Sequence, residues 1–222
     1  MRDNPAERNG MSELLGQISE NLMKGKAKDV QTLVEQAIAE GIEPSKILTE
    51  GLLSGMSIIG TRFKKNEIYV PEVLIAARAM KSGISVLQPK LTSAGVEPKG
   101  TAVVGTVKGD LHDIGKNLVC MMLEGAGFKV VDAGIDVEPA KFIQIASDNN
   151  ATIIGVSALL TTTMTNMKAV VDAVKASDIA AKTKVIIGGA PVTQSFADEI
   201  GADGYAADAA SAADLALSLL SA

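Results

Sequence analysis

The chain has 222 residues, enough for one large domain or two small ones with a buried core. Its formal net charge of −5 argues against binding to the phosphate backbone of nucleic acid, and aromatic residues, at 3%, offer no platform for stacking bases. No apolar run is long enough to cross a membrane, the N-terminus lacks a signal-peptide pattern, and the single cysteine, Cys120, excludes an internal disulfide. These features predict a cytoplasmic protein with an aliphatic core that binds neither nucleic acid nor membranes.

Residues 11–90 predict a helical bundle, preceded by a flexible N-terminus at residues 1–10. Breaks in the helical pattern fall at Gly25, Gly41 and Asn66, and Pro71 suits the first turn of a last helix that continues to residue 88. Four or five short helices with short connections favour an antiparallel bundle. Apolar residues with helical spacing support this prediction: Leu14, Leu15, Ile18, Leu22, Val30, Leu33, Val34, Ala37, Ile38, Ile47, Leu48, Leu52 and Leu53.

Residues 91–99 are typical of a linker, and the pattern changes in residues 100–222. Alternating apolar strands and amphipathic helices there predict a parallel sheet with helices on both faces, a five-stranded Rossmann-like or flavodoxin-like domain. The predicted fold class is therefore α/β, with a helical bundle before the sheet. Ligands of such sheets bind beyond the carboxyl ends of the strands. The expected strands are residues 101–106, 128–134, 151–157, 184–189 and, more weakly, 202–207, and clear helices are expected at residues 137–150 and 164–177.

The segment VGTVKGDLHDIGKNLV, residues 104–119, contains the only histidine of the chain, His112, in the loop that leaves the first predicted strand. A phosphate-binding loop is disfavoured because five residues separate Gly109 from Gly115, and because Asn117 follows Lys116 where that motif needs a hydroxyl. A zinc site needs three or four protein ligands, which one histidine and one cysteine do not supply. A triad hydrolase needs a nucleophile motif that the sequence lacks.

Two interpretations of His112 stay open on chemistry alone. It could cap the helix that follows, which is the favoured interpretation for an arbitrary lone histidine. It could instead bind a metal whose equatorial positions a macrocycle already fills, because such a metal needs one axial ligand from the protein. Asp110 would then accept the other imidazole N–H and raise the basicity of the ligand. Gly109 and Gly115 would let the backbone approach a bulky ligand.

The motif DLHDIG, residues 110–115, resembles the D-x-H-x-x-G motif of cobalamin-binding proteins. The resemblance continues through SALLT (157–161), GGA (188–190) and YAADA (205–209). In the helical half, residues 50–80 resemble the cap of cobalamin-dependent methionine synthase. The whole chain is similar to the small corrinoid proteins of methyltransferase systems, which serve methylamines, methanol, betaines or aromatic methyl ethers. The resemblance implies a cap domain at residues 11–90 and a cobalamin-binding domain at residues 100–222.

The resemblance also implies a role for individual residues of the sheet domain. His112 would replace the cofactor's own lower base as the axial ligand of cobalt, and Asp110 would hold its imidazole. Thr163 would extend this relay at a position where methionine synthase has a serine. Gly188 and Gly189 would give the nucleotide tail of the cofactor room in a slot of the sheet domain. The other implied contacts to the cofactor are Gly109, Leu111, Asp113, Ile114, Gly115, Ser157, Leu159, Thr161, Tyr205 and Ala209.

In the cap, the resemblance places Phe63 and Val70 over the upper face of the cofactor and Glu50 at its edge. The cofactor would be cobalamin or a related corrinoid, whose cobalt alternates between cob(I)alamin and methylcobalamin forms. His112 would bind and leave the cobalt once per cycle. The implied partners are a substrate-specific methyltransferase, an acceptor methyltransferase that uses a thiol or tetrahydrofolate, and a reductive activase. The carrier would not be catalytic alone.

Two other functions share parts of this pattern. A cobalamin-dependent sensor has the same two domains, but usually adds a DNA-binding or signalling domain, for which the first ten residues leave no room. The small subunit of an adenosylcobalamin mutase resembles only residues 100–222, so the predicted cap at residues 11–90 argues against it. We therefore expect a methyl carrier and keep the sensor and the mutase subunit as alternatives.

Overall fold

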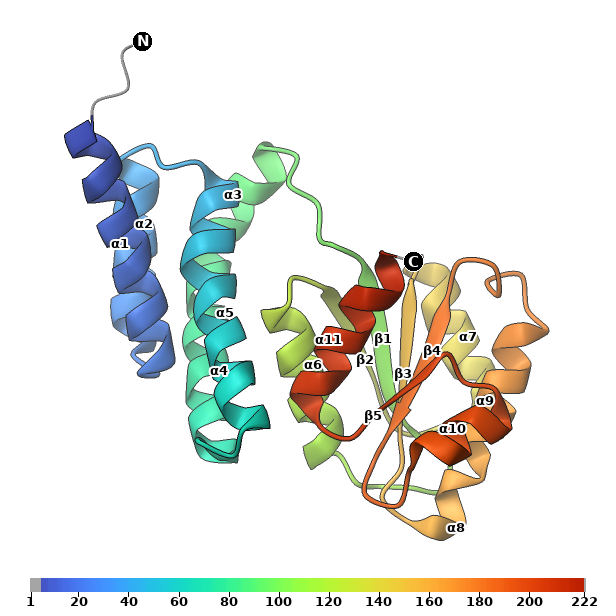
Figure 1. Ribbon diagram of the computed structural model, residues 1–222. Helices are drawn as coiled ribbons and strands as arrows, with labels where there is room; N and C mark the ends of the chain where they lie inside the picture. Colours follow the sequence, from blue (N-terminus) through green and yellow to red (C-terminus); the bar gives the residue numbers. More distant parts are fainter. Residues whose placement is uncertain (1–4, 222) are drawn as a thin grey trace. The chain divides into compact units, whose positions relative to one another are not determined.

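The computed structural model describes residues 5–221, in two compact units that divide between Glu97 and Pro98 (Figure 1). The first four residues of the predicted flexible N-terminus lie outside the described residues. No helix among the described residues is both long and apolar enough to cross a bilayer.

The first unit is a helical bundle, as predicted. Helix α1 packs against α2, η1 and α4, and α2 packs against α5. The segments from α3 to α4 follow one another without a break, and η1 between them is a π-helix, a rarer form in which each turn is wider than in an α-helix. The bounds are α1 Pro5–Met23, α2 Ala27–Ala39, α3 Pro44–Lys46, η1 Ile47–Leu53, α4 Ser54–Lys64 and α5 Val70–Ser93.

Two predicted boundaries of this unit were wrong. Helix α1 begins at Pro5, so residues 5–10 are helical rather than flexible; proline suits the first position of a helix because it has no amide hydrogen to leave unpaired. Helix α5 continues through Pro89 to Ser93, so the first three residues of the predicted linker are helical. Leu91 is buried against the bundle, which explains why the helix extends this far.

The second unit is a five-stranded parallel sheet with helices on both faces, which confirms the predicted fold class. The strand order is β2-β1-β3-β4-β5. Helices α6 and α11 pack together on one face, whereas α7 and α9 cover the other (Figure 1). The strands are β1 Thr101–Val107, β2 Lys129–Val137, β3 Ile153–Ser157, β4 Lys184–Gly188 and β5 Gly204–Ala206; the helices are α6 Ile114–Gly125, α7 Pro139–Asp148, α8 Thr161–Met164, α9 Asn166–Lys175, α10 Gln194–Ile200 and α11 Ala209–Leu220.

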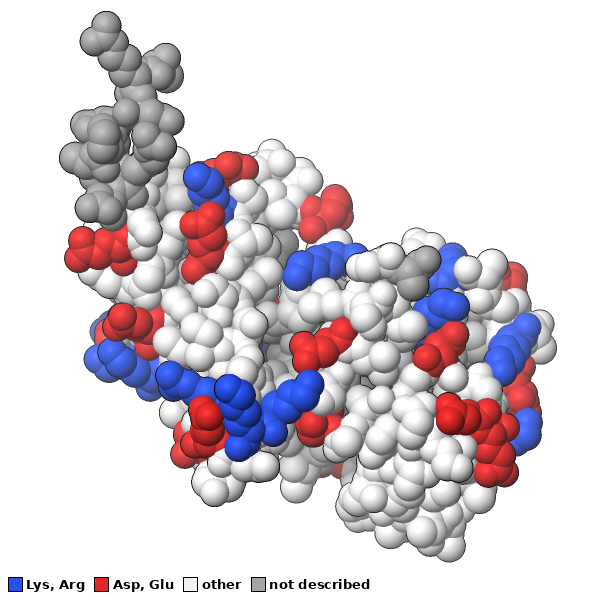
Figure 2. All heavy atoms as spheres, in the orientation of Figure 1, with Lys and Arg blue, Asp and Glu red and all other residues white. Residues whose placement is uncertain are grey.

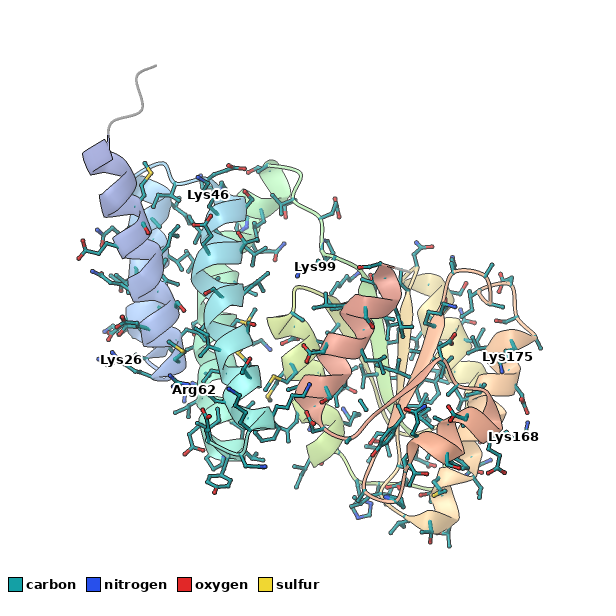
Figure 3. All side chains as sticks on the ribbon, in the orientation of Figure 1. Lys26, Lys46, Arg62, Lys99, Lys168 and Lys175 are labelled. Atoms are coloured by element: carbon teal, nitrogen blue, oxygen red, sulfur yellow. The ribbon has the colours of Figure 1, made fainter. Side chains whose placement is uncertain are left out.

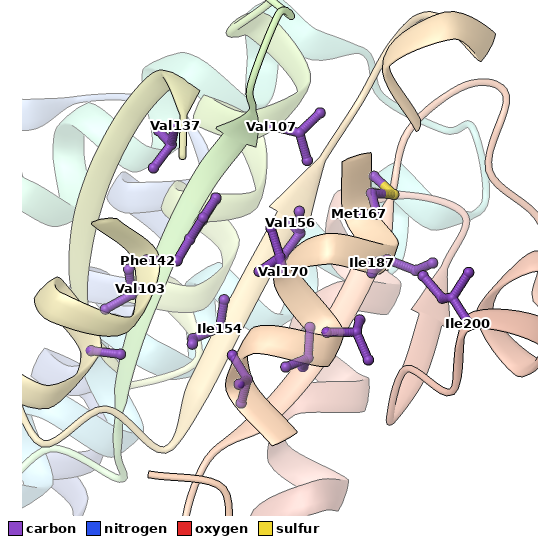
Figure 4. Close-up of a cluster of buried hydrophobic side chains, with 14 of the residues drawn as sticks. Val103, Val107, Val137, Phe142, Ile154, Val156, Met167, Val170, Ile187 and Ile200 are labelled. Atoms are coloured by element: carbon purple, nitrogen blue, oxygen red, sulfur yellow. The ribbon is translucent and has the colours of Figure 1, made fainter. Parts of the chain in front are cut away.

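The core of this unit is aliphatic, as the composition predicted. Val103, Ile154 and Ile187 project from neighbouring strands toward Phe142 on α7 and Val170 on α9, and all five are buried (Figure 4). Strands β1, β3 and β4 are apolar along most of their length because helices cover both sides of the sheet, whereas the edge strand β2 is largely exposed and carries polar residues. The surface of the unit carries both signs of charge close together, including the Lys168–Asp172 pair on α9 (Figures 2 and 3).

The strand order places a topological switch point at the carboxyl edge of the sheet, between β1 and β3. The chain leaves β1 toward α6 on one face, and it leaves the adjacent strand β3 toward α8 and α9 on the other face. Loops that diverge in this way from neighbouring parallel strands form the usual ligand site of open α/β sheets. The β1–α6 loop holds His112, so the fold places the lone histidine at this point.

Candidate functional site

The centre of the site is the carboxylate of Asp110, which is completely buried between the β1–α6 and β3–α8 loops. Its Oδ1 lies 2.7 Å from Nδ1 of His112 and accepts the His112 amide at 3.1 Å. Its Oδ2 accepts the Thr163 hydroxyl at 2.7 Å and the Leu159 amide at 2.8 Å, with the Leu160 amide at 3.4 Å. One carboxylate therefore joins the two loops and holds the histidine.

These hydrogen bonds keep the buried carboxylate ionised. Burial by itself would raise the pKa of Asp110, because a carboxylate loses its hydration inside a protein. The hydrogen bonds from Thr163, Leu159 and His112 outweigh that effect and hold the pKa of Asp110 well below its ordinary value. Asp110 is therefore negatively charged at neutral pH, although it is buried.

One ring nitrogen of His112, Nδ1, is held by the Asp110 carboxylate. The side chain of His112 is 50% exposed, and its backbone oxygen accepts the Thr106 hydroxyl at 2.8 Å. An ionised Asp110 can only accept, so the neutral imidazole carries its proton on Nδ1 and keeps a lone pair on Nε2. Within residues 5–221, no hydrogen bond engages Nε2. That nitrogen is free to bind a metal ion or to take up a proton.

His112 does not cap helix α6, so this simpler interpretation was wrong. The helix begins at Ile114, and Asp113 occupies the capping position without a side-chain hydrogen bond to the helix. The His112 side chain instead bonds back to Asp110, outside the helix. The hydrogen bond to Asp110 thus fixes the imidazole without involving the helix end.

Exposed apolar side chains surround the histidine. Leu111 and Ile114 are 68% and 72% exposed, and Ile135, Leu159 and Leu160 are also exposed; no other large apolar side chains of the described sheet unit are as open to solvent. All five lie at the carboxyl edge of the sheet, in or next to the loops after β1, β2 and β3. Large apolar groups gathered in this way mark a binding surface.

The glycines at the site have different surroundings and backbone conformations, so the structural reason for a glycine differs from one position to the next. A β-carbon at Gly115 would meet no protein atom within 4 Å, so the space beside it is open. Gly109 has φ +81°, a conformation that favours glycine. At Gly189 a β-carbon would lie 1.8 Å from the oxygen of Ala158, and at Gly188 it would lie 2.9 Å from the oxygen of Ala206. The last two are thus glycines because neighbouring backbone fills their side-chain space.

The remaining sequence-predicted residues of the sheet unit lie along its carboxyl edge. Ser157 ends β3 and is half-buried, and Thr161 is the exposed first residue of α8. Tyr205 lies in β5 and packs against the hydrophobic core, and Ala209 is the buried first residue of α11. Parallel topology therefore brings the predicted residues of four separate loops, those after β1, β3, β4 and β5, to one edge.

The predicted cap residues belong to the helical unit. Phe63 lies near the end of α4 and Val70 begins α5, and both are half-buried. Glu50 is exposed within the π-helix η1. Their predicted roles toward a cofactor stay predictions.

Sequence reasoning missed two polar residues of strand β2. Oδ1 of Asp136 accepts a hydrogen bond from the Gly109 amide at 2.6 Å. Oδ2 of Asp132 accepts a hydrogen bond from Nζ of Lys116 at 2.5 Å. Lys116 is only 2% exposed, so this ion pair ties α6 to the sheet. Cys120 lies one turn further along α6, where burial raises the pKa of its thiol to about 12. No motif in the sequence signals these contacts, because they join segments that are distant along the chain.

Comparisons with known proteins agree with this geometry. A family model described as "B12 binding domain" matches residues 100–214, and a second with the same description matches residues 14–88. A corrinoid protein of Desulfitobacterium hafniense is 40% identical over 210 residues, which are 93% of this chain and 97% of that protein. A dimethylamine corrinoid protein of Methanosarcina barkeri is 43% identical over 209 residues, which are 94% of this chain and 98% of that protein.

A solved structure has a similar fold. The crystal structure of the methanol:cobalamin methyltransferase complex MtaBC from Methanosarcina barkeri contains a chain that matches with a TM-score of 0.83 and 31% identity, over 94% of this chain and 80% of that one. Family models thus cover both units, and relatives match along nearly the full length. The chain belongs to the family of B12-binding corrinoid proteins.

Proposed function

We propose that this chain carries a methyl group on corrinoid cobalt from a substrate-specific methyltransferase to an acceptor methyltransferase. The observation that supports this proposal is the Asp110–His112 pair, in which Nδ1 is held at 2.7 Å by Asp110 and the His112 side chain is half exposed. The names of the relatives, a dimethylamine corrinoid protein and a methanol:cobalamin methyltransferase complex, support the link to methyl transfer. The family model that matches residues 14–88 argues against a mutase subunit, which would resemble the sheet unit alone.

The residues at the carboxyl edge fit a flat metal macrocycle. A bound corrinoid would take one nitrogen ligand from the protein and would need an apolar surface beside it. His112 offers the nitrogen, and Leu111, Ile114 and Leu159 offer exposed apolar contacts. The open space beside Gly115 leaves room for the ring to approach the backbone.

The residues of the chain orient the ligand and manage its proton. The bound corrinoid supplies the chemistry, since its cobalt takes up and releases the methyl group. Asp110 holds the proton of His112 on Nδ1 and so keeps the lone pair on Nε2. Thr163 donates to Oδ2 and leaves Oδ1 to the histidine.

The proposal also assigns roles to residues other than His112. Phe63 and Val70 would shelter the upper face of the corrinoid, and Glu50 would reach its edge. Ser157, Thr161, Gly188, Gly189, Tyr205 and Ala209 would line the path of the nucleotide tail. The acceptor methyltransferase, the reductive activase and a cytoplasmic location also stay predictions.

Electron paramagnetic resonance tests the axial ligand directly. Protein labelled with 15N at its one histidine would be loaded with cob(II)alamin. We expect hyperfine coupling to the histidine nitrogen, and we expect His112→Ala to bind cobalamin without that coupling. A spectrum in which the cofactor's own base stays on cobalt in the wild-type protein would refute the assignment.

Methyl transfer is tested by adding partners to the loaded protein. Candidate methyltransferases would be supplied with methylamines, methanol, betaines or aromatic methyl ethers, and the loss of the reduced spectrum would be followed. We expect one donor and enzyme pair to methylate the wild-type protein. If the loaded and reduced protein accepts no methyl group from any of these pairs, the carrier role is wrong, even if His112 ligates the metal.

A further inference from the structure

Asp136 on strand β2 has an unusual backbone for a residue with a side chain. Its φ is +53°, in the left-handed region where glycine is favoured. Strand β2 is irregular here: Val104 to Val107 spans three steps on β1, whereas the paired residues Asp132 to Val137 span five steps on β2. Such bulges redirect side chains and often lie next to functional sites.

Asp136 forms hydrogen bonds to the backbone before and after the α-carbon of Asp110. Asp136 Oδ1 accepts the Gly109 amide at 2.6 Å, and the Asp136 amide donates to the Asp110 carbonyl oxygen at 3.1 Å. Glycine at position 136 would adopt this conformation without strain, but it would lose the bond to Gly109. Among residues 5–221, the Asp136 side chain therefore accepts one hydrogen bond, from the amide of Gly109. Gly109 directly precedes Asp110, whose buried carboxylate is the centre of the site.

We propose that Asp136 is a positioning residue for the axial ligand: its bonds to Gly109 and Asp110 set the depth of the Asp110 carboxylate and thereby the direction of His112 Nε2. The inference rests on the proposed function. Asp110 must reach Thr163, Leu159 and His112 at the same time, at 2.7 to 2.8 Å. A small shift of the loop would break at least one of these bonds, so the loop needs an anchor on the side of β2.

The neighbouring ion pair does not provide this anchor. Lys108 Nζ lies 2.6 Å from Glu138 Oε1 and also joins the loop to the end of β2, but both side chains are more than half exposed. Exposed ion pairs contribute little because water screens them and the long side chains lose entropy. The Asp136 bond instead joins a carboxylate to a backbone amide at 2.6 Å, which restrains the main chain directly.

The test uses variants that separate the side chain from the backbone. Asp136→Gly keeps the left-handed backbone and removes the acceptor. Asp136→Asn keeps an acceptor oxygen and tolerates the same backbone. The matched control is Asn150→Gly, because Asn150 has φ +49° but lies before β3, at the opposite edge of the sheet.

Two readouts use the protein without cofactor. In Asp136→Gly we expect amide hydrogen exchange at Gly109 to quicken at least about tenfold, in line with one lost charge-assisted hydrogen bond. We also expect the 15N signals of the single imidazole to shift or broaden. In Asp136→Asn both readouts should stay near those of the wild-type protein, and in Asn150→Gly they should not change. If Asp136 only stabilised another part of the fold, its replacement would not change the 15N signals of the His112 imidazole.

A third readout is the dissociation constant for cobinamide, a corrinoid without the nucleotide tail. We expect about tenfold weaker binding to Asp136→Gly, since partners that support a metal ligand typically contribute 10- to 100-fold in affinity. Unchanged imidazole signals and unchanged affinity in this variant would overturn the inference. If the wild-type protein did not ligate cobalt through His112, the proposed function would fail, while the two readouts without cofactor would still decide the role of Asp136.

Discussion

Replacing Asp110 with asparagine should move the proton of His112 from Nδ1 to Nε2. Asparagine has one acceptor oxygen and one NH2 group, whereas both oxygens of Asp110 face donors. An NH2 group at the Oδ2 position would oppose the backbone amides of Leu159 and Leu160. At the Oδ1 position it would oppose only the amide of His112, because the imidazole can change its tautomer and accept at Nδ1. The second orientation should therefore prevail.

The magnitude follows from the bonds that change. The His112 amide, 3.1 Å from Oδ1, would lose its acceptor, and an unpaired buried donor costs about 1–3 kcal/mol. The remaining bonds would lose their charge assistance, so we expect the free energy of unfolding of the variant to fall by about 2–4 kcal/mol in total. With hydrogen on Nε2, the ring offers no lone pair outward, and corrinoid affinity should fall by about 10- to 100-fold.

The same substitution has a pH signature. The pKa of Asp110 is lowered in the folded protein, so the carboxylate stabilises the fold above the pKa of the unfolded chain, about 3.9 for aspartate, and this stability is lost as the pH falls below that value. Asparagine does not titrate. The difference in unfolding free energy between the wild-type protein and Asp110→Asn should be complete at neutral pH and shrink below about pH 4.

The assay for the tautomer is 15N NMR of the apo-protein, in which the only imidazole belongs to His112. The chemical shifts of the two ring nitrogens show which of them carries hydrogen. The matched control is Asp113→Asn, since the Asp113 side chain is exposed and accepts only from Asn117, at 3.2 Å. If hydrogen stays on Nδ1 in Asp110→Asn, the orientation argument is wrong; if urea unfolding is unchanged, the energetic argument is wrong.

Three further predictions concern the surroundings of the site. Thr163→Val should lower the free energy of unfolding by about 1.5–3 kcal/mol in urea titrations, because it removes the hydroxyl donor to Asp110, while the exposed control Thr162→Val should have little effect. Iodoacetamide should modify Cys120 at pH 8 far more slowly in the folded protein than in urea, since a pKa of about 12 leaves roughly a thousandth of the usual thiolate; equal rates would contradict the burial argument. Gly189→Ala should cost at least about 3 kcal/mol by the same titration, because its β-carbon would lie 1.8 Å from a backbone oxygen, and a near-normal midpoint would contradict that contact.

Much of the fold was predictable because burial on both faces gives strands β1, β3 and β4 nearly continuous apolar runs. Residues 101–107 are buried almost throughout, and the matching run in the sequence is what predicted β1. Strand β2 was harder. It was expected to end at residue 134, but it extends to Val137. Its last residues contain a left-handed aspartate and a bulge, whose cause is contact with the β1–α6 loop, and such tertiary contacts leave no periodic signal.

The site was predictable only where its members are close in sequence or share a known motif. Asp110 and His112 are two residues apart, and their pairing follows from chemistry. Thr163 came from the resemblance, and the structure places its hydroxyl 2.7 Å from Asp110. Asp136 could not be found in this way, because 27 residues separate it from Gly109 and only the register of two strands brings them together.

The topology of the sheet explains why a lone histidine in a glycine-rich loop can be a ligand. An ionised carboxylate is costly to bury unless several donors converge on it, and a single loop rarely supplies enough. Here β1 and β3 are neighbours whose loops diverge to opposite faces, so the amide of Leu159 and the hydroxyl of Thr163 reach Asp110 from one side while His112 reaches it from the other. The charge that fixes the imidazole is thus stabilised by a loop that does not contain the imidazole. It follows that a change in the β3–α8 loop alone should alter how the imidazole of His112 is held, even if the changed residue does not contact the ring.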